Sequence, residues 1–227
     1  MTTVTRPASA TWQLDGSHAS LCTASIKCSL DLANGTHEVA IHAPDALSHL
    51  QLWQLHQLQD LPLTEAYVRL SDLVACYGEG PAFPFHTDIY WTVLDTAELA
   101  TALLVLQLII SVRTDRLETH PELDLVSTAA QPDIELISCV AGRAVRVVLN
   151  DQLHLVEFAT DEDSPELTLV GDEGGRSFSR RLFGHFLEKG VIRRARLFAA
   201  VIPAETSPAE VRELCDQLAA TKWPLTV

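Results

Sequence analysis

The chain has 227 residues, of which 47% are hydrophobic and 20% charged, and its formal net charge at pH 7 is −14. A chain of this length can bury a substantial core, and the composition is unlike that of a disordered protein. The negative charge argues against nucleic acid as the main partner. The longest apolar stretch, residues 102–110, is interrupted by Gln107. It is about half as long as a membrane-spanning helix, so no membrane association is expected.

The N-terminal residues and the cysteines both favour a cytoplasmic location. Residues 1–7 contain one basic residue and no apolar run, so we expect no secretory signal peptide. The five cysteines are an odd number without Cys-x-x-Cys spacing, which is typical of free thiols. No local cluster has the spacing of metal ligands and no cofactor motif is present, so we expect neither a metal nor a cofactor.

The first strong pattern in the chain is a β-hairpin. Apolar residues at even positions over residues 20–32 predict one long strand with a buried face. Asn34-Gly35, the preferred residue pair for a type I′ turn, follows it. A two-residue turn at this place would bring apolar side chains together on one face. The expected pairs are Leu30 with Val39 and Cys28 with Ile41.

Ten further segments have the apolar content and spacing of strands. The stretch 103–113 is apolar on both faces and rich in β-branched residues, which favours a central strand over a buried helix. The segment 191–202 is apolar on both faces at its far end and is expected to be another interior strand. The remaining strands are expected at residues 50–58, 66–70, 73–77, 89–94, 134–139, 144–149, 153–158 and 166–170.

Two helices are expected near the C-terminus. The first spans residues 176–190, where Gly190 stands at the place of a left-handed C-cap. The second begins at Ser207, because Ser207-Pro208-Ala209-Glu210 combines an N-cap, a proline at the first helical position and a capping-box glutamate. The apolar residues at helical spacing in the first helix are Phe178, Leu182, Phe183, Phe186 and Leu187.

Many short strands followed by two helices predict a mainly β (α+β) chain, built as an antiparallel two-sheet sandwich with two C-terminal helices. A large mutarotase-like double sandwich is an alternative that rests on strand count alone. We expect the whole chain, residues 1–227, to form a single β-rich domain. Residues 131–133, Gln-Pro-Asp, are the best candidate for an internal boundary.

The charges are segregated in the C-terminal third of the chain. Residues 151–173 hold eight acids and no base, whereas residues 176–196 hold seven bases and one acid. We expect the two blocks to neutralise each other across neighbouring elements. The alternative is that the basic segment binds an acidic partner and that the chain is a protein–protein adaptor.

A glycine-rich segment, GDEGGRS at residues 171–177, precedes the first expected helix. Backbone amides at a helix N-terminus can bind an anion, and Arg176 and Arg180 lie close in sequence. Asp172 and Glu173 oppose an anion at the same place. The segment is therefore a weak candidate anion site.

Residues 75–91, ACYGEGPAFPFHTDIYW, form the strongest candidate site. Aromatic faces beside a histidine and carboxylates can stack on a sugar ring and hydrogen-bond its hydroxyls. The rings can instead anchor a turn-rich loop over the open end of the sandwich, which is the favoured interpretation. The candidate ligand-binding residues are Tyr77, Phe83, Phe85, Tyr90 and Trp91, and the candidate catalytic residues are His86, Glu79 and Asp88.

Three classes of function follow, in order of preference. The first is a non-catalytic module that binds a small ligand, such as a carbohydrate, or a partner. The second is a carbohydrate-active enzyme of the isomerase or epimerase type, with His86 and either Glu79 or Asp88 as acid and base. The third is the adaptor that uses the basic segment.

Overall fold

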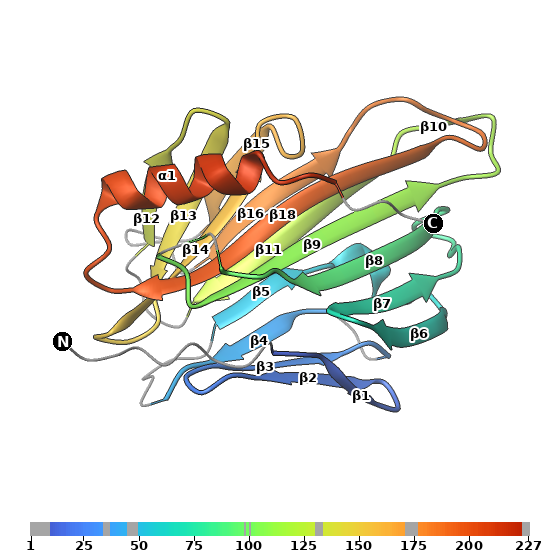
Figure 1. The fold of residues 1–227 in the computed structure, drawn as a ribbon. Coiled ribbons are helices and arrows are strands. Elements are labelled where there is room, and N and C mark those ends of the chain that lie inside the picture. The colour runs from blue at the N-terminus through green and yellow to red at the C-terminus, as the bar shows by residue number, and fades with distance from the viewer. Residues whose placement is uncertain are drawn as a thin grey trace.

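The computed structural model describes residues 10–33, 37–44, 50–97, 99, 101–129, 134–170 and 177–223. It is 56% strand, and its strands form two large antiparallel sheets (Figure 1). The inward side chains of both sheets meet in one apolar core. The predicted antiparallel two-sheet sandwich is therefore confirmed.

The first sheet has eight strands and includes the N-terminal part of the chain. Its strands are β1 (Gln13–Asp15), β2 (His18–Cys22), β3 (Lys27–Asp31), β4 (Val39–His42), β5 (Leu50–Gln54), β11 (Glu122–Ala129), β15 (Glu166–Val170) and β16 (Ser177–Phe183). They lie in the order β1-β2-β3-β4-β5-β11-β16-β15. A short 3₁₀ helix, η1 (His56–Leu58), follows β5.

The second sheet also has eight strands. They are β6 (Leu63–Arg69), β7 (Asp72–Tyr77), β8 (His86–Val93), β9 (Leu104–Arg113), β12 (Ile134–Ser138), β13 (Gly142–Val148), β14 (Leu153–Thr160) and β18 (Ile192–Pro203). They lie in the order β12-β13-β14-β18-β9-β8-β7-β6, so the expected central strands β9 and β18 are confirmed. The short strands β10 (Glu118–Thr119) and β17 (Leu187–Glu188) pair as a separate ribbon.

Both sheets contain strands from the two sides of residues 131–133, the candidate boundary. Those three residues themselves lie outside the described part of the chain. Because each sheet is completed by later strands, the described strands make up one pair of sheets rather than two sandwiches in series.

The C-terminal helix α1 (Pro208–Ala219) lies on the outer face of the second sheet, over β12, β13, β14 and β18 (Figure 1). Its predicted start is confirmed. The Ser207 hydroxyl oxygen accepts a hydrogen bond from the amide of Glu210, and a Glu210 carboxylate oxygen accepts one from the amide of Ser207. At the other end, Arg196 donates to the carbonyl oxygens of Ala219 and Thr221. No helix in the described residues is long and apolar enough to cross a membrane.

The single long strand predicted over residues 20–32 is wrong, because the chain reverses in its middle. β2 and β3 pair antiparallel across a turn. The hydroxyl oxygen of Thr23 closes this turn by accepting a hydrogen bond from the amide of Ile26 at 2.9 Å. The turn moves the buried positions from even numbers in β3 to odd numbers in β2, where Ala19 and Leu21 face the core.

The register predicted for the following hairpin is confirmed in part. β3 and β4 pair with Cys28 opposite Ile41, as the sequence predicts. Leu30 and Val39 would form the next pair in this register, and both are buried. The paired residues of the two strands end one position earlier, at Ser29 and Ala40. The expected turn at residues 34–35 lies outside the described residues.

The helix predicted over residues 176–190 is also wrong, since the described part of this segment forms β16 and β17. The cause is Arg180, which is buried. Phe178, Arg180 and Leu182 occupy the inward face of a strand with period two, and an arginine in the middle hides that pattern. Gly190 does have positive φ, 77°, but in a turn before β18 and not at a helix end. The described C-terminal residues therefore form one helix, α1, instead of the two expected.

Arg180 is buried because it pairs with Glu157 of β14, on the opposite sheet. Both side chains are 1% exposed, and Arg180 Nε lies 2.7 and 2.9 Å from the two carboxylate oxygens. The indole nitrogen of Trp53 also donates to Glu157, at 3.5 Å. Burial raises the pKa of Glu157, and the guanidinium of Arg180 opposes that rise. One base of the basic segment and one acid of the acidic segment thus neutralise each other inside the core.

We expect Arg180→Met to lower the free energy of unfolding by about 3–5 kcal/mol, because it leaves the Glu157 carboxylate buried without its partner. The double variant Arg180→Met with Glu157→Leu should recover most of the loss. Denaturant unfolding measures both. Arg181→Met is the matched control, because Arg181 pairs with Asp124 at the surface and its loss should change little. A small effect of Arg180→Met alone would contradict this account.

All five cysteines are free thiols in the structure. Cys28 and Cys215 are buried, and Cys22 is exposed at the end of β2. Burial raises the pKa of Cys28 to about 12, so its thiol stays protonated at neutral pH. Cys22 and Cys28 lie on two neighbouring strands and not, as the sequence predicted, on one.

Candidate functional site

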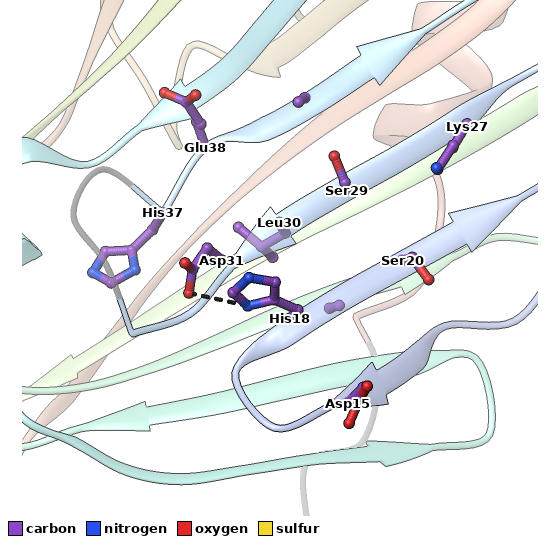
Figure 2. A pocket seen from close by; sticks show the side chains of 11 residues that line it. Asp15, His18, Ser20, Lys27, Ser29, Leu30, Asp31, His37 and Glu38 are labelled. Atoms are coloured by element: carbon purple, nitrogen blue, oxygen red, sulfur yellow. Dashed lines mark ion pairs between the residues drawn. The ribbon is translucent and has the colours of Figure 1, made fainter.

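The outer face of β1–β4 carries a polar pocket (Figure 2). Alternation along β2 and β3 turns the apolar residues toward the core and the polar ones outward. In the antiparallel register His18 lies opposite Asp31, and Ser20 lies opposite Ser29. Since paired residues point to the same face of a sheet, these side chains stand next to one another on the outer surface.

The pocket has a volume of about 490 Å³, within the usual range for small-ligand sites. Among the described residues, the only aromatic rings that line it are the imidazoles of His18 and His37. Its polar lining comes from three strands and the residues just before β4. These side chains are Asp15, His18, Ser20, Lys27, Ser29, Asp31, His37 and Glu38.

One wall of the pocket is an ordered group around Asp31. A carboxylate oxygen of Asp31 lies 3.7 Å from His18 Nδ1 and accepts a hydrogen bond from the Ser17 hydroxyl at 3.1 Å. The same oxygen accepts one from the amide of Ala33 at 3.0 Å. The carboxylate is thereby fixed in position before any ligand arrives.

A second wall is formed by Glu38. Its two carboxylate oxygens accept hydrogen bonds from the side-chain amides of Gln51 and Gln54, at 2.7 and 2.6 Å. Gln54 also donates to the amide oxygen of Gln51 at 3.2 Å. This network holds Glu38 against the outer face of the sheet.

His37 lies behind the pocket and is only 2% exposed. Its Nε2 lies 3.2 Å from the carbonyl oxygen of Leu58, which can only accept, so Nε2 carries the proton. The Tyr77 hydroxyl lies 3.3 Å from His37 Nδ1 and 3.2 Å from the carbonyl oxygen of Leu32. Burial lowers the pKa of His37, so the ring is uncharged at neutral pH.

The pKa of His37 predicts a loss of stability in mild acid. Its pKa is lower in the folded than in the unfolded chain, so the unfolded chain takes up the proton first as the pH falls below about 6.5. The free energy of unfolding should therefore decrease from pH 7.5 to pH 5.5. In His37→Gln it should decrease by a smaller amount. Urea unfolding at both pH values tests this. Equal decreases in the two proteins would show that His37 does not contribute.

The aromatic residues predicted to bind a ligand lie mostly in the core. Tyr77, Phe83, Phe85 and Trp91 are each less than 5% exposed. The Phe83 and Phe85 rings contact each other, with centroids 4.8 Å apart. Tyr90 differs from them, because it lies on the outward face of β8 and is partly exposed. The four buried rings belong to the core cluster, so little of their surface is exposed.

Two of the three predicted catalytic residues lie together. His86 Nε2 is 3.6 Å from a carboxylate oxygen of Glu79, and both side chains are about one-third exposed. Asp88 lies on the same outward face of β8 as His86, but opposite Cys76 of β7. Asp88 contributes to a rise in the pKa of the Cys76 thiol, to about 12, for which burial is the larger cause. The structure thus brings Glu79 and His86 together and places Asp88 beside a different neighbour.

We expect Phe85→Ala to lower the free energy of unfolding by about 3–5 kcal/mol, the usual cost of truncating a buried aromatic ring. Phe83→Ala should fall in the same range. The control is Phe186→Ala, which removes a ring that is 40% exposed and should cost far less. Denaturant unfolding provides the values. If Phe85→Ala is as stable as the control variant, the ring does not stabilise the core and is again a candidate ligand contact.

The candidate anion site is not supported at Arg180, whose guanidinium is committed to Glu157 in the core. Arg176 lies outside the described residues. Of the other bases in the segment, Arg193 and Arg194 lie together at the start of β18. Arg181 pairs with Asp124 on the first sheet, Arg196 lies under the end of α1, and Arg193 is exposed on β18.

No family model matches this chain, and no curated protein matches it. Among solved structures, the heparan sulfate lyase HepC from Pedobacter heparinus is similar, with 9% identity and a TM-score of 0.49 over 84% of this chain. The heparinase III BT4657 gene product is similar with 11% identity and a TM-score of 0.42 over 87% of this chain. In both comparisons the chain spans about a third, 34%, of the other protein. At these identities the comparisons assign no ligand or activity to this chain.

Proposed function

We propose that this chain is a non-catalytic β-sandwich module that binds a small hydroxyl-rich ligand, a monosaccharide or polyol, in the pocket on β1–β4. The observation that supports the proposal best is a set of unused polar groups in that pocket. Asp15, Ser20, Lys27 and Ser29 line it, and none of them has a side-chain hydrogen bond or ion pair to another described residue. Two hydroxyls, an ammonium and a carboxylate are thus available to a ligand.

The chemistry of the lining favours hydroxyls on the ligand. A sugar hydroxyl both donates and accepts, so it can pair with a carboxylate, a serine hydroxyl or an ammonium in turn. The charges favour a neutral or cationic ligand, because the lining contains three carboxylates and a single lysine. The net charge of −14 also favours a neutral or cationic ligand over an anion. An amino sugar fits these requirements better than a uronate or a sulfated sugar.

The arrangement of His18 supports binding rather than catalysis. In a serine–histidine–acid relay, one ring nitrogen contacts the serine and the other contacts the acid. Here Ser17 and Asp31 both approach the same nitrogen, His18 Nδ1, at 3.3 and 3.7 Å. The ring therefore cannot pass a proton from the serine to the acid, and a nucleophilic role for Ser17 does not follow.

The test is a titration of the ¹⁵N-labelled protein with glucosamine, glucose and glucuronate, followed by NMR. A ligand of about 12 non-hydrogen atoms, at about 0.3 kcal/mol per atom, has a dissociation constant on the order of millimolar. Glucosamine should shift the amide signals of β2 and β3, glucose should bind more weakly, and glucuronate most weakly. If none of the three shifts these signals, the proposal fails.

Two variants locate the ligand. The double variant Ser20→Ala with Ser29→Ala should weaken glucosamine binding about tenfold, because it removes two hydrogen-bonding hydroxyls. Asp15→Asn should reduce the preference for glucosamine over glucose. Ser138→Ala and Asp151→Asn are the controls, since both residues are exposed and neither lines the pocket. If the controls weaken binding as much as the pocket variants, the ligand lies elsewhere.

A further inference from the structure

Three side chains with metal-binding groups converge at the start of β8, away from the pocket on β1–β4. Glu79 follows β7, His86 is the first residue of β8, and Asp115 follows β9. One carboxylate oxygen of each acid and one ring nitrogen of His86 all lie within 4.8 Å of one another. His86 Nε2 lies 3.6 Å from Glu79 Oε1.

The two loops that supply the acids are fixed to each other and to the core. The hydroxyl of Thr114 donates to the carbonyl oxygen of Pro84 at 3.3 Å, and its oxygen accepts a hydrogen bond from the amide of Arg116 at 3.2 Å. Phe83 and Phe85, on either side of Pro84, are buried. The positions of the three polar residues are thus set by contacts that do not involve their own side chains.

We propose that Glu79, His86 and Asp115 bind a divalent transition-metal ion, of the Mn²⁺ or Zn²⁺ type. One imidazole nitrogen and two carboxylates form a donor set that suits these ions better than Ca²⁺ or Mg²⁺, which prefer oxygen ligands alone. Around a tetrahedral Zn²⁺ the ligand atoms stand roughly 3.4 Å apart, given metal–ligand distances of about 2.0–2.1 Å. The 3.6 Å between His86 and Glu79 is close to that spacing.

The geometry favours a metal over a proton shared between the histidine and the glutamate. At 3.6 Å the two atoms lie beyond hydrogen-bond distance, so no direct hydrogen bond holds them together. Asp115 adds a second carboxylate, and two carboxylates close together repel each other unless a cation lies between them. With three protein ligands, at least one coordination position stays open to water. The ion would tie the loop after β9 to the loop before β8.

Arg113 lies beside the proposed site, and its positive charge gives a second test of metal binding. It lies directly opposite His86 in the ladder between β8 and β9, and it is exposed. Paired residues point to the same side of a sheet, so its guanidinium adds positive charge beside the proposed ion. Removing that charge should strengthen metal binding, whereas removing a ligand should weaken it.

The experiment is isothermal titration calorimetry of the chelator-treated, full-length protein with MnCl₂, ZnCl₂, MgCl₂ and CaCl₂, with electron paramagnetic resonance to detect bound Mn²⁺. We expect one site for Mn²⁺ and Zn²⁺ with a dissociation constant on the order of micromolar. His86→Gln and Asp115→Asn should each weaken it about 100-fold or more. Arg113→Gln should strengthen it several-fold. Thermal unfolding without metal verifies that each variant is folded.

The controls are Asp88→Asn and Glu118→Gln, which change carboxylates two and three residues from a ligand in sequence that are not themselves among the three ligands. Both should bind metal as the parent protein does. The proposal is overturned if neither Mn²⁺ nor Zn²⁺ binds more tightly than about 1 mM. It is equally overturned if binding persists unchanged in His86→Gln, which would place the ion at other side chains. Tight binding of Ca²⁺ or Mg²⁺ that does not depend on His86 would also reject it.

Discussion

A carboxylate and a guanidinium that meet between the two sheets determine how the sandwich closes. Glu157 belongs to the second sheet and Arg180 to the first, and each would cost several kcal/mol to bury alone. Any register that separated them would leave two unpaired charges in an apolar core. Trp53 is a third partner in this contact, because its indole nitrogen donates to Glu157. Its backbone has a positive φ, 61°, and it lies at an irregularity in the pairing of β5 with β11. The pair therefore selects one alignment of the sheets, although an apolar pair would serve stability as well.

Because the inner faces are filled by apolar side chains and the Glu157–Arg180 pair, the polar groups open to solvent lie on the outer faces and in the loops. The outer face of β12, β13, β14 and β18 is covered by α1, which Arg196 holds through its C-terminal carbonyls. A cation at this end of a helix also opposes the negative end of the helix dipole. The outer face of β1–β4 has no such cover among the described residues, and it is there that the pocket forms. The pocket in which we propose that a ligand binds thus lies on the face that α1 does not cover.

Local rules of sequence predict the parts of this fold that depend on neighbouring residues. The capping box at Ser207, the central strand β9 and the pairing of Cys28 with Ile41 were all predictable, since each is set by a few residues in sequence. The strand β16 was not, because the burial of Arg180 depends on a partner 23 residues away on another sheet. No periodicity rule assigns an arginine to a core.

In the candidate sites, too, the sequence predicts what depends on neighbouring residues and misses what depends on distant ones. Lys27, Ser29 and Asp31 alternate with apolar residues in the sequence, which predicts a polar outer face. That this face would form a pocket depends on β1 and on the residues before β4, and the reversal between β2 and β3 was missed. Asp115 is one of many exposed acids in the sequence, and only the fold places it beside His86. Sequence could therefore nominate Glu79 and His86 but not the residue that completes their group.

Residues 75–91 have two interpretations from the sequence, a ligand site or an anchor, and burial divides their side chains between the core and the surface. Along β8 successive side chains point to opposite faces, so Trp91 faces the core while His86 and Tyr90 face outward. Phe85 precedes His86 and is buried, which fixes the backbone from which the imidazole projects. An anchored strand loses little further freedom on binding, so the buried rings would lower the entropic cost of the metal binding that we propose at His86. In this stretch Phe83, Phe85 and Trp91 thus lie in the core, whereas His86 and Tyr90 project from the outer face of β8.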